Sequence, residues 1–342
     1  MTQRHRIWAI NATAIGRLLG WLTAGLLVMA CSSSDSKPAA AKGRIIVAVT
    51  IDWEGAVLDD DALDALDALR DTLGPTPITH FVSAAYFTKQ PPDATASAAI
   101  RQAVRPGDEL AVHLHAWRSL AKASEIEPKL APSFLTGTDK LLEFPDGDVG
   151  FDVDVDAYSV ADLRALLRTS RKLLEAAGTV SKSFRAGGYL GTPKMLQAIR
   201  DEGYRVDSSA TDHRQLDLST DEVLARRVAE IWPKIDVTSQ PFLVPGPGRP
   251  LVEIPIAAFA DDATAVEMVA VFDAAHARLR KEPTRDVFVV LGFHQETATE
   301  FASRIAEVVA AVRARREIAG QLLFTTIEYA GELARGTLVP AP

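Results

Sequence analysis

The sequence predicts an α/β fold, a distorted (β/α) barrel of about seven mainly parallel strands, and two observations lead to it. Short runs rich in β-branched residues alternate along the chain with longer segments in which apolar residues recur at helical spacing. Such alternation is typical of strand–helix units whose strands pair in parallel. Because roughly seven or eight units are expected within about 290 residues, a barrel is favoured over an open sheet.

The first expected strand, 44–51, is a continuous β-branched and apolar run, which is typical of a strand buried on both faces. The other expected strands are 78–84, 109–113, 183–186, 204–208, 251–256, 287–293 and 322–327. The helices expected between them are 59–73, 94–104, 158–177, 192–202, 264–281 and 299–317. The long segments 120–157 and 212–250 are expected to form loops over one end of the barrel.

Composition limits the class of protein. The chain has 342 residues, with 37 Lys and Arg against 45 Asp and Glu and a net charge of -8. This acidic balance argues against a general nucleic-acid binder, which needs clustered basic residues. A single cysteine excludes an intrachain disulfide and a cysteine-rich zinc site. With no break in composition, residues 44–335 are expected to form one domain.

The N-terminus is expected to be a targeting segment and not part of the folded domain. Residues 1–17 are basic and 18–30 are apolar, a run shorter than the roughly 20 residues that span a bilayer. The run ends at Cys31, in a sequence that resembles a bacterial lipobox except that Met29 is not small. The resemblance implies a lipoprotein signal over 1–30, acylation of Cys31, a flexible tether over 31–43 and attachment to the membrane of the bacterial cell envelope, facing the periplasm or exterior. The alternative is an uncleaved signal anchor with an incidental cysteine.

Polar residues collect where the expected strands end, and in a parallel barrel these ends meet at one mouth. They are Asp52, Glu54, His113, His115, Arg185, Asp207 and His294. Carboxylates and histidines of this kind can hold a divalent metal ion. A further carboxylate can take a proton from water, a further histidine can protonate a leaving amine, and an arginine can orient a carboxylate. The set therefore predicts metal-assisted hydrolysis of an amide or ester.

The segments that carry these residues, in their order, resemble the NodB-homology polysaccharide deacetylases. The matching segments are 50–54, 109–115, 184–189, 207–209 and 291–294, and the resemblance covers about 44–330. It implies a distorted barrel, one divalent metal ion, most often zinc, and removal of N-acetyl groups from a glycan. It also implies that Arg185 orients the base, that His294 is the leaving-group acid and that Asp207 orients His294.

The first departure from the family pattern concerns the acids. Trp53 stands where the common first motif has a second aspartate. A side branch of the superfamily has an acid-x-acid motif, which implies that Asp52 binds the metal and Glu54 is the base. The reverse assignment remains open. Because the first strand neighbours the last ones in a closed barrel, Glu54 and His294 are expected to lie close together.

Two more departures lie at the third and fourth strands. Trp117 stands four residues after His113, where the family has its second metal histidine, so His115 is the expected substitute. Its alternative role is a hydrogen bond that supports the site. After Arg185 the chain has Ala-Gly-Gly in place of the usual proline.

The expected substrate-facing rings at the mouth are Trp53, Trp117 and Tyr189, with core packing an equal alternative for either tryptophan. Two other functions stay open. One is a metal-free hydrolase of the same barrel that acts on a small amide. The other is a non-catalytic lipoprotein that binds glycan. No protein partner can be inferred.

Overall fold

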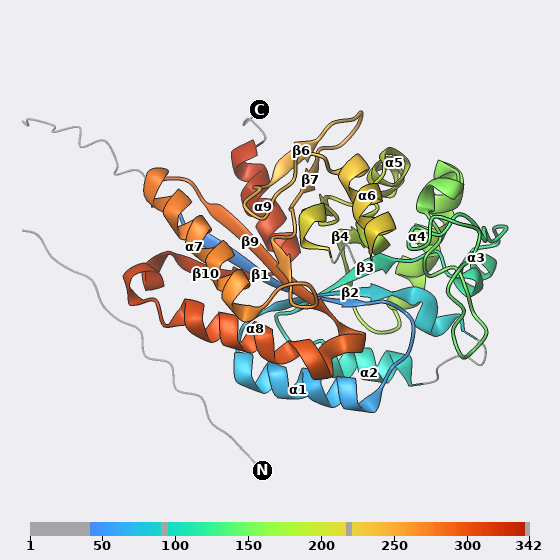
Figure 1. Cartoon of the computed structure of the whole chain (residues 1–342), viewed down its shortest axis with the longest axis horizontal. Coiled ribbons are helices and arrows are strands. Elements are labelled where there is room, and N and C mark those ends of the chain that lie inside the picture. Colours follow the sequence, from blue (N-terminus) through green and yellow to red (C-terminus); the bar gives the residue numbers. More distant parts are fainter. Residues whose placement is uncertain (1–41, 90–94, 217–220, 339–342) are drawn as a thin grey trace, which may run out of the picture. The chain divides into compact units, whose positions relative to one another are not determined.

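The computed structural model describes residues 42–89, 95–216 and 221–338 (Figure 1). The expected signal segment, Cys31 and most of the tether lie outside the described residues. No helix within the described ranges is both long enough and apolar enough to cross a membrane.

Ten strands in the described part of the chain form one sheet, with the order β6-β7-β5-β4-β3-β2-β1-β9-β8, and β10 also pairs with β1. The strands are β1 (Ile45–Trp53), β2 (Ile78–Ser83), β3 (Glu109–Leu114), β4 (Val180–Ala186), β5 (Val206–Asp207), β6 (Phe242–Val244), β7 (Leu251–Glu253), β8 (Ala258–Phe259), β9 (Val287–His294) and β10 (Leu322–Thr325). Only β6 and β7 pair antiparallel; the other described pairs are parallel.

The sheet curls because a short piece of chain joins β7, the strand next to one edge, to β8 at the other edge. β7 pairs with β5 and β8 pairs with β9, and only 254–257 connect β7 to β8. Along this connection Ile254 N donates to Asp207 O at 2.8 Å and Ala257 N donates to Val290 O at 2.9 Å. The distorted (β/α) barrel expected from the sequence is therefore confirmed, with more strands than the seven expected.

All eight expected strands are present, and the two that the sequence did not reveal are β6 and β8. Both are very short, so neither leaves a run of apolar residues long enough to recognise. The last strand ends at Thr325, because Ile327 already begins a helix.

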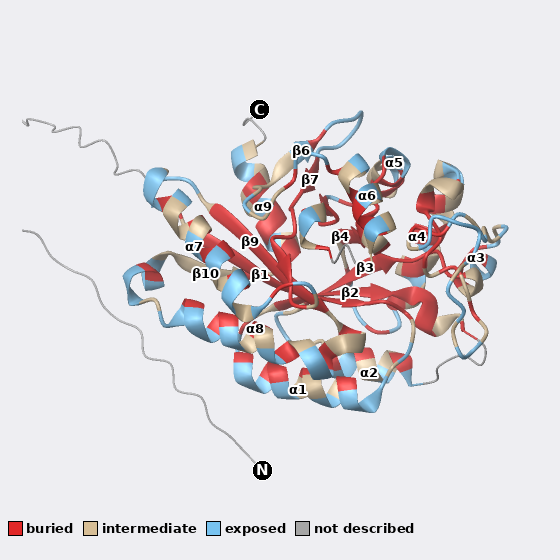
Figure 2. Cartoon of the chain, in the orientation of Figure 1, coloured by how far each residue is buried: buried red, intermediate tan, exposed pale blue. Residues whose placement is uncertain are grey.

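The helices cover the sheet, and their apolar residues face it (Figure 2). They are α1 (Asp60–Leu73), α2 (Ala96–Ala103), α3 (Arg118–Ala123), α4 (Val160–Leu174), α5 (Pro193–Asp201), α6 (Glu222–Ile231), α7 (Ala265–Lys281), α8 (Ala298–Arg313) and α9 (Ile327–Leu338). Capping boxes at Ser159 and Thr264 fix the starts of α4 and α7. α6 and most of α3 lie in the segments expected to be loops, and α9 was not expected.

β1 lies at the centre of the sheet and is buried along its whole length, as its apolar run predicts. Its last residues reach the carboxyl end of the sheet, where Asp52 pairs in register with His294 of β9. The expected closeness of the first strand and the strand near 290 is confirmed. The carboxyl ends of β1, β3, β4 and β9 therefore bring distant parts of the sequence together.

Candidate active site

Three histidines surround one buried carboxylate at the carboxyl end of the sheet. Glu54 directly follows β1, and its Oε1 lies 3.2 Å from His113 Nε2 and 3.3 Å from His294 Nε2. Its Oε2 lies 2.5 Å from His115 Nε2. We call Glu54, His113, His115 and His294 the histidine cluster. Burial alone would raise the pKa of Glu54, but His115 and His113 hold it well below its usual range.

The outer nitrogens of two of these histidines are held by backbone carbonyls. His113 Nδ1 lies 3.1 Å from Arg185 O, and His115 Nδ1 lies 2.7 Å from Phe151 O. A carbonyl oxygen only accepts hydrogen bonds, so each Nδ1 carries a proton. In the neutral tautomer that this selects, Nε2 of each ring points a lone pair at Glu54. A carboxylate is also an acceptor. The three groups thus turn lone pairs toward one another.

This arrangement fits a metal ion. The candidate ligand atoms of Glu54, His113 and His115 all lie within 4.8 Å of one another. Glu54 Oε2 and His115 Nε2 are buried and make no hydrogen bond, despite their 2.5 Å separation. Two histidine nitrogens and one carboxylate oxygen form the donor set of many catalytic zinc sites.

A second set of close ligand atoms consists of Asp52, Glu54 and His294, and it fits a cation less well. Asp52 Oδ1 accepts a hydrogen bond from Arg185 Nη1 at 2.6 Å, so its charge is already balanced and a guanidinium would repel a cation. The sequence assigned Asp52 and not Glu54 to the metal. In the structure Glu54, and not Asp52, lies between the two histidines.

Arg185 is a rigid support for Asp52. Its side chain is 0% exposed. Nη1 also donates to Thr50 Oγ1 at 2.9 Å, while Nε and Nη2 donate to the carbonyl and hydroxyl oxygens of Ser208 at 2.7 and 2.9 Å. The guanidinium stacks on Phe81, 4.2 Å from the ring centre. With its donors fixed in this way, Arg185 holds the carboxylate of Asp52 in one orientation.

His294 is the most exposed member of the cluster, with 26% of its side chain accessible, and it has a carboxylate behind it. Its Nδ1 lies 3.0 Å from Asp261 Oδ1, and its backbone N donates to Asp261 Oδ2 at 3.2 Å. Burial alone would lower the pKa of His294, but Asp261, followed by Glu54 and Asp52, raises it well above the usual value. Asp261 lies just after β8.

The resemblance implied that Asp207 orients His294, and the structure corrects this, because Asp261 is the carboxylate in contact with His294. Asp207 accepts a hydrogen bond from Ser209 Oγ at 2.5 Å, and Glu253, its partner in register on β7, accepts from Ala210 N at 2.8 Å. The other two oxygens, Asp207 Oδ2 and Glu253 Oε2, are buried and make no hydrogen bond. We call Asp207 and Glu253 the carboxyl pair. Burial raises the pKa of Asp207 to about 6 and that of Glu253 well above its usual value, the latter with help from the charge of Asp207. Asp207 is therefore engaged in the carboxyl pair, and the carboxylate that contacts His294 is Asp261.

For the two tryptophans, substrate contact and core packing were both open, and the structure shows core packing. Both are 0% exposed. Trp53 Nε1 donates to His80 Nδ1 at 3.2 Å, and Trp117 Nε1 donates to Glu54 O at 3.0 Å. Neither ring face is open to a sugar, because each indole packs inside the barrel wall. Tyr189 is 7% exposed and packs edge-on against Phe259.

The short histidine spacing and the glycines after Arg185 are linked. His115 lies so close to Gly187 that a Cβ atom added there would meet its imidazole atoms at 2.4 Å. On its other side His115 stacks on Phe151, with ring centres 4.2 Å apart and planes 10° apart. The imidazole is therefore clamped between a residue without a side chain and an aromatic ring. A bulkier residue at 187 would displace His115.

A fourth carboxylate supports the cluster and was not expected from the sequence. Glu296 Oε1 accepts from Glu54 N at 3.1 Å and from Tyr86 Oη at 2.7 Å. Burial, together with the nearby charge of Glu54, raises the pKa of Glu296 to about 7. Glu296 follows His294 by two residues, so its place at a strand end was the available signal.

Comparison with known proteins adds information about the fold. No protein-family model matches the chain, and no curated protein matches its sequence. Among solved structures, a candidate polysaccharide deacetylase from Mycobacterium smegmatis is 16% identical with a TM-score of 0.53, over 90% of this chain and 95% of that one.

Two further structures are about equally similar. A candidate polysaccharide deacetylase from Pseudomonas aeruginosa PAO1 is 13% identical with a TM-score of 0.52, over 86% of this chain and 92% of that one. The Puue allantoinase is 12% identical with a TM-score of 0.52, over 89% of this chain and 94% of that one. At these identities the similarity concerns the fold, and the chain shares the fold of these polysaccharide deacetylase and allantoinase structures.

Proposed function

We propose that this chain is a metal-dependent hydrolase that removes N-acetyl groups from a glycan of the bacterial cell envelope. The observation that carries the proposal is the buried carboxylate of Glu54, whose two oxygens lie 3.2 Å from His113 Nε2 and 2.5 Å from His115 Nε2. The shared fold with polysaccharide deacetylases supports the same reaction class. Glu54, His113 and His115 would hold the ion, and we propose zinc because two imidazoles and a carboxylate suit it.

This assignment reverses the roles that the acid-x-acid pattern implied for the two acids. Glu54 is the metal ligand and Asp52 is the base. A divalent ion supplies Lewis-acid polarisation of a carbonyl group and favours ionisation of water. The remaining chemistry belongs to residues of this chain.

Asp52 accepts the proton of the attacking water. Arg185 Nη1 binds Oδ1 of Asp52, so the proton is taken by the other oxygen, Oδ2. The fixed guanidinium prevents the carboxylate from rotating. A general base in this position typically contributes about 10²–10⁴-fold to the rate.

His294 delivers a proton to the departing amine. Its Nε2 faces the cluster, and it is accessible while its Nδ1 is bound to Asp261. Asp261 fixes the ring orientation and stabilises the protonated imidazole, so His294 has the position and partner that a leaving-group acid needs. Asp261 is a positioning residue in this scheme.

The location in the cell is part of the proposal. Acylation of Cys31 would tether the domain to a membrane, and the residues between Cys31 and β1 are small and polar. Replacing Cys31 with Ala should release the protein from membranes without changing its rate in detergent. A mature N-terminus that maps well downstream of Cys31 would contradict the anchor.

The test of the proposed activity is acetate release from N-acetylated oligosaccharides by metal-loaded protein and by Asp52→Asn and His294→Ala variants. Release that is slowed at least about 100-fold in each variant supports the mechanism. Ring opening of allantoin or a similar small amide, with no acetate from any glycan, would favour the small-amide hydrolase instead. That alternative has the allantoinase fold match in its favour. Glycan binding without turnover of either substrate would favour a binding protein.

A further inference from the structure

Glu54 lies one residue beyond the end of β1, where the sheet no longer holds its backbone. β1 pairs with β2 as far as Trp53 and with β9 as far as Asp52. Two side chains take the place of the missing strand partners. Glu54 N donates to Glu296 Oε1 at 3.1 Å, and Glu54 O accepts from Trp117 Nε1 at 3.0 Å. The position of this candidate metal ligand therefore depends on these two side chains.

The indole of Trp117 is itself held by a buried cation. Lys89 is 7% exposed, and its Nζ lies 3.7 Å from the centre of the Trp117 ring. An ammonium ion over the face of an indole is attracted by the electrons of the ring, most strongly where water is excluded. Phe144 packs edge-on against the same indole, with ring centres 4.6 Å apart. Together these contacts fix the direction in which the indole N–H points.

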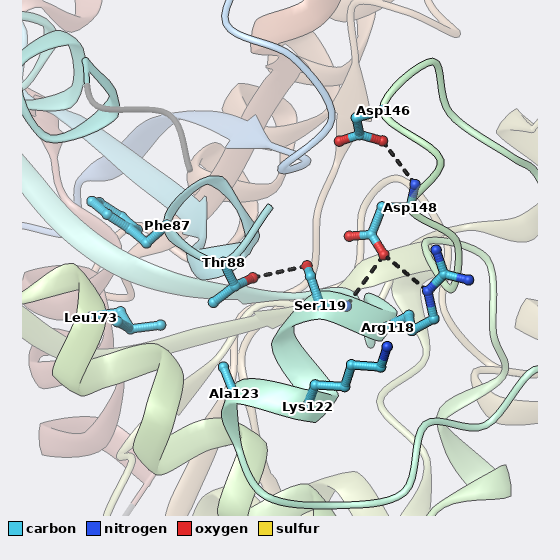
Figure 3. Close-up of a pocket in the computed structure, with 9 residues that line it drawn as sticks. All are labelled: Phe87, Thr88, Arg118, Ser119, Lys122, Ala123, Asp146, Asp148 and Leu173. Atoms are coloured by element: carbon cyan, nitrogen blue, oxygen red, sulfur yellow. Dashed lines mark hydrogen bonds and ion pairs between the residues drawn. The ribbon is translucent and has the colours of Figure 1, made fainter. Parts of the chain in front are cut away.

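Two aspartates balance the charge of Lys89. Its Nζ lies 2.9 Å from Asp146 Oδ2 and 3.9 Å from Asp148 Oδ2. Both carboxylates belong to the loop at 146–148 beside α3 (Figure 3). Asp148 Oδ1 accepts from Ser119 N at 3.2 Å, and Asp148 N donates to Asp146 Oδ1 at 2.9 Å. The two acids are therefore fixed to the fold, and they hold the ammonium against the indole.

Packing alone does not explain a lysine at this place. Taking an ammonium ion out of water is costly even when the ion is paired, and an unbranched apolar side chain would fill the same space without that cost. What the charge adds is a directed attraction, to the acids of the loop and to the face of the indole. An apolar side chain would contact the indole without fixing its orientation in this way.

We propose that Lys89 is a positioning residue for the metal site, acting through the indole of Trp117 on the backbone of Glu54. This inference rests on the proposed function, in which Glu54 is a metal ligand. The contacts run from the loop at 146–148 through Lys89 and Trp117 to Glu54 O. They also give a role to the tryptophan that stands four residues after His113, in the place of a metal histidine: it supports a ligand instead of being one.

The experiment measures zinc affinity, by titration with a competing chelator, in Lys89→Met, Trp117→Phe and the double variant. Methionine keeps the unbranched shape of lysine and removes its charge, while phenylalanine keeps an aromatic ring and removes the N–H. Lys89→Arg tests rescue, because a guanidinium also stacks on indole and binds carboxylates. Arg44→Met is the matched control, because it takes a cation away from Asp286 at the opposite end of β1.

Lys89→Met should lower the zinc affinity about 10-fold, the lower end of the range for residues that orient metal ligands. Lys89→Arg should recover most of this loss, and Trp117→Phe should lose at least as much as Lys89→Met. In the Trp117→Phe background Lys89→Met should cost almost nothing more, since the two residues act in series. Arg44→Met should bind zinc like the wild type. Denaturant unfolding of the metal-free variants checks that each is folded.

Cobalt in place of zinc gives a readout that a loss of stability alone would not change. The visible absorption of Co²⁺ depends on the number and geometry of its ligands, so a displaced Glu54 should alter the spectrum of Lys89→Met and not that of Arg44→Met. Unchanged zinc affinity and an unchanged cobalt spectrum in Lys89→Met would overturn the proposal. Equal losses of zinc affinity from Lys89→Met in the wild-type and Trp117→Phe backgrounds would also overturn it, because Lys89 would then act without the indole.

Acetate release from N-acetylated oligosaccharides, measured in parallel, separates this inference from the proposed function. Acetate release together with a zinc affinity that does not depend on Lys89 overturns the inference and leaves the proposed function standing. A zinc affinity that depends on Lys89, without acetate release from any oligosaccharide, supports the inference and overturns the proposed function.

Discussion

Two groups of buried carboxylates lie at the carboxyl ends of the strands and differ in how their lone pairs are satisfied. In the histidine cluster, Glu54 lies between imidazole nitrogens whose own protons point the other way, toward backbone carbonyls. In the carboxyl pair, Ser209 Oγ donates to Asp207 and Ala210 N donates to Glu253, while the second oxygen of each acid is buried without a hydrogen bond. The lone pairs of the histidine cluster call for a bound cation, whereas the facing acids of the carboxyl pair call for a proton.

This difference separates chemistry from architecture. A carboxyl pair that shares a proton is neutral at one of its members and stabilises the packing of β5 against β7. It also leaves Arg185 free to bind Asp52, which carries the nearest carboxylate to the guanidinium. Buried acids at the end of a strand therefore do not by themselves make a catalytic site. What distinguishes the two groups is whether the neighbouring side chains present protons or lone pairs to the carboxylate.

The largest expected effect comes from a matched pair of substitutions. Glu54→Gln should lose at least about 100-fold in zinc affinity, measured by titration with a competing chelator, because the amide is a poor ligand. Glu253→Gln should bind zinc like the wild type, since its amide can still accept from Ala210 N and can donate to Asp207. Equal zinc affinity in the two variants would show that the histidine cluster is not the metal site.

The next effect distinguishes the two acids that flank Trp53. Asp52→Asn should lower the turnover number by about 10²–10⁴-fold while zinc affinity stays close to the wild-type value. The reason is that Asp52 contacts Arg185 and not the two imidazoles. Loss of zinc binding in Asp52→Asn would restore the assignment implied by the acid-x-acid motif.

A smaller effect is expected at Gly187, which lies against the histidine cluster. Gly187→Ala places a Cβ 2.4 Å from the His115 imidazole. The ring must move, and it then loses the hydrogen bond from Nδ1 to Phe151 O that orients it. We expect zinc affinity to fall about 10- to 100-fold, as for other residues that orient a ligand. Gly178→Ala is the control, because its Cβ would meet only Leu110 Cδ2 at 3.5 Å. Equal zinc affinity in both alanine variants would contradict the link between Gly187 and His115.

Much of the fold could be predicted, since the strands that carry the site are long apolar runs. β1 and β9 are nearly continuous in buried residues, which predicts central neighbouring strands, and their pairing brings Glu54 to His294. The strand-end rule also brought His113 and Arg185 to the same mouth. These inferences needed only hydrophobicity and topology.

The partners of the site residues could not be predicted, because they depend on loops. Asp261 follows β8, a strand of two residues, and nothing in its sequence connects it to His294. The carbonyl of Phe151 reaches His115 from a segment with little regular structure. Whether Trp53 packs inward or faces a substrate depends on its neighbour His80, which is distant in the sequence.

The smallest expected effect is on stability, and it tests the protonated character of the carboxyl pair. Burial raises the pKa of Asp207 to about 6 in the folded protein, whereas an unfolded aspartate titrates near about 4. Between these values the folded state binds more protons than the unfolded state, so this contribution to stability is full below about pH 4 and is lost as the pH rises toward about 6. Asp207→Asn should remove that loss, so its free energy of unfolding should fall less than that of the wild type over this interval.

Denaturant unfolding at several pH values, with chelator present, measures this free energy. Asp139→Asn, at an exposed aspartate, should keep the wild-type slope. An unchanged slope in Asp207→Asn would mean that the carboxyl pair is ionised and that its neutrality does not explain why Arg185 binds Asp52.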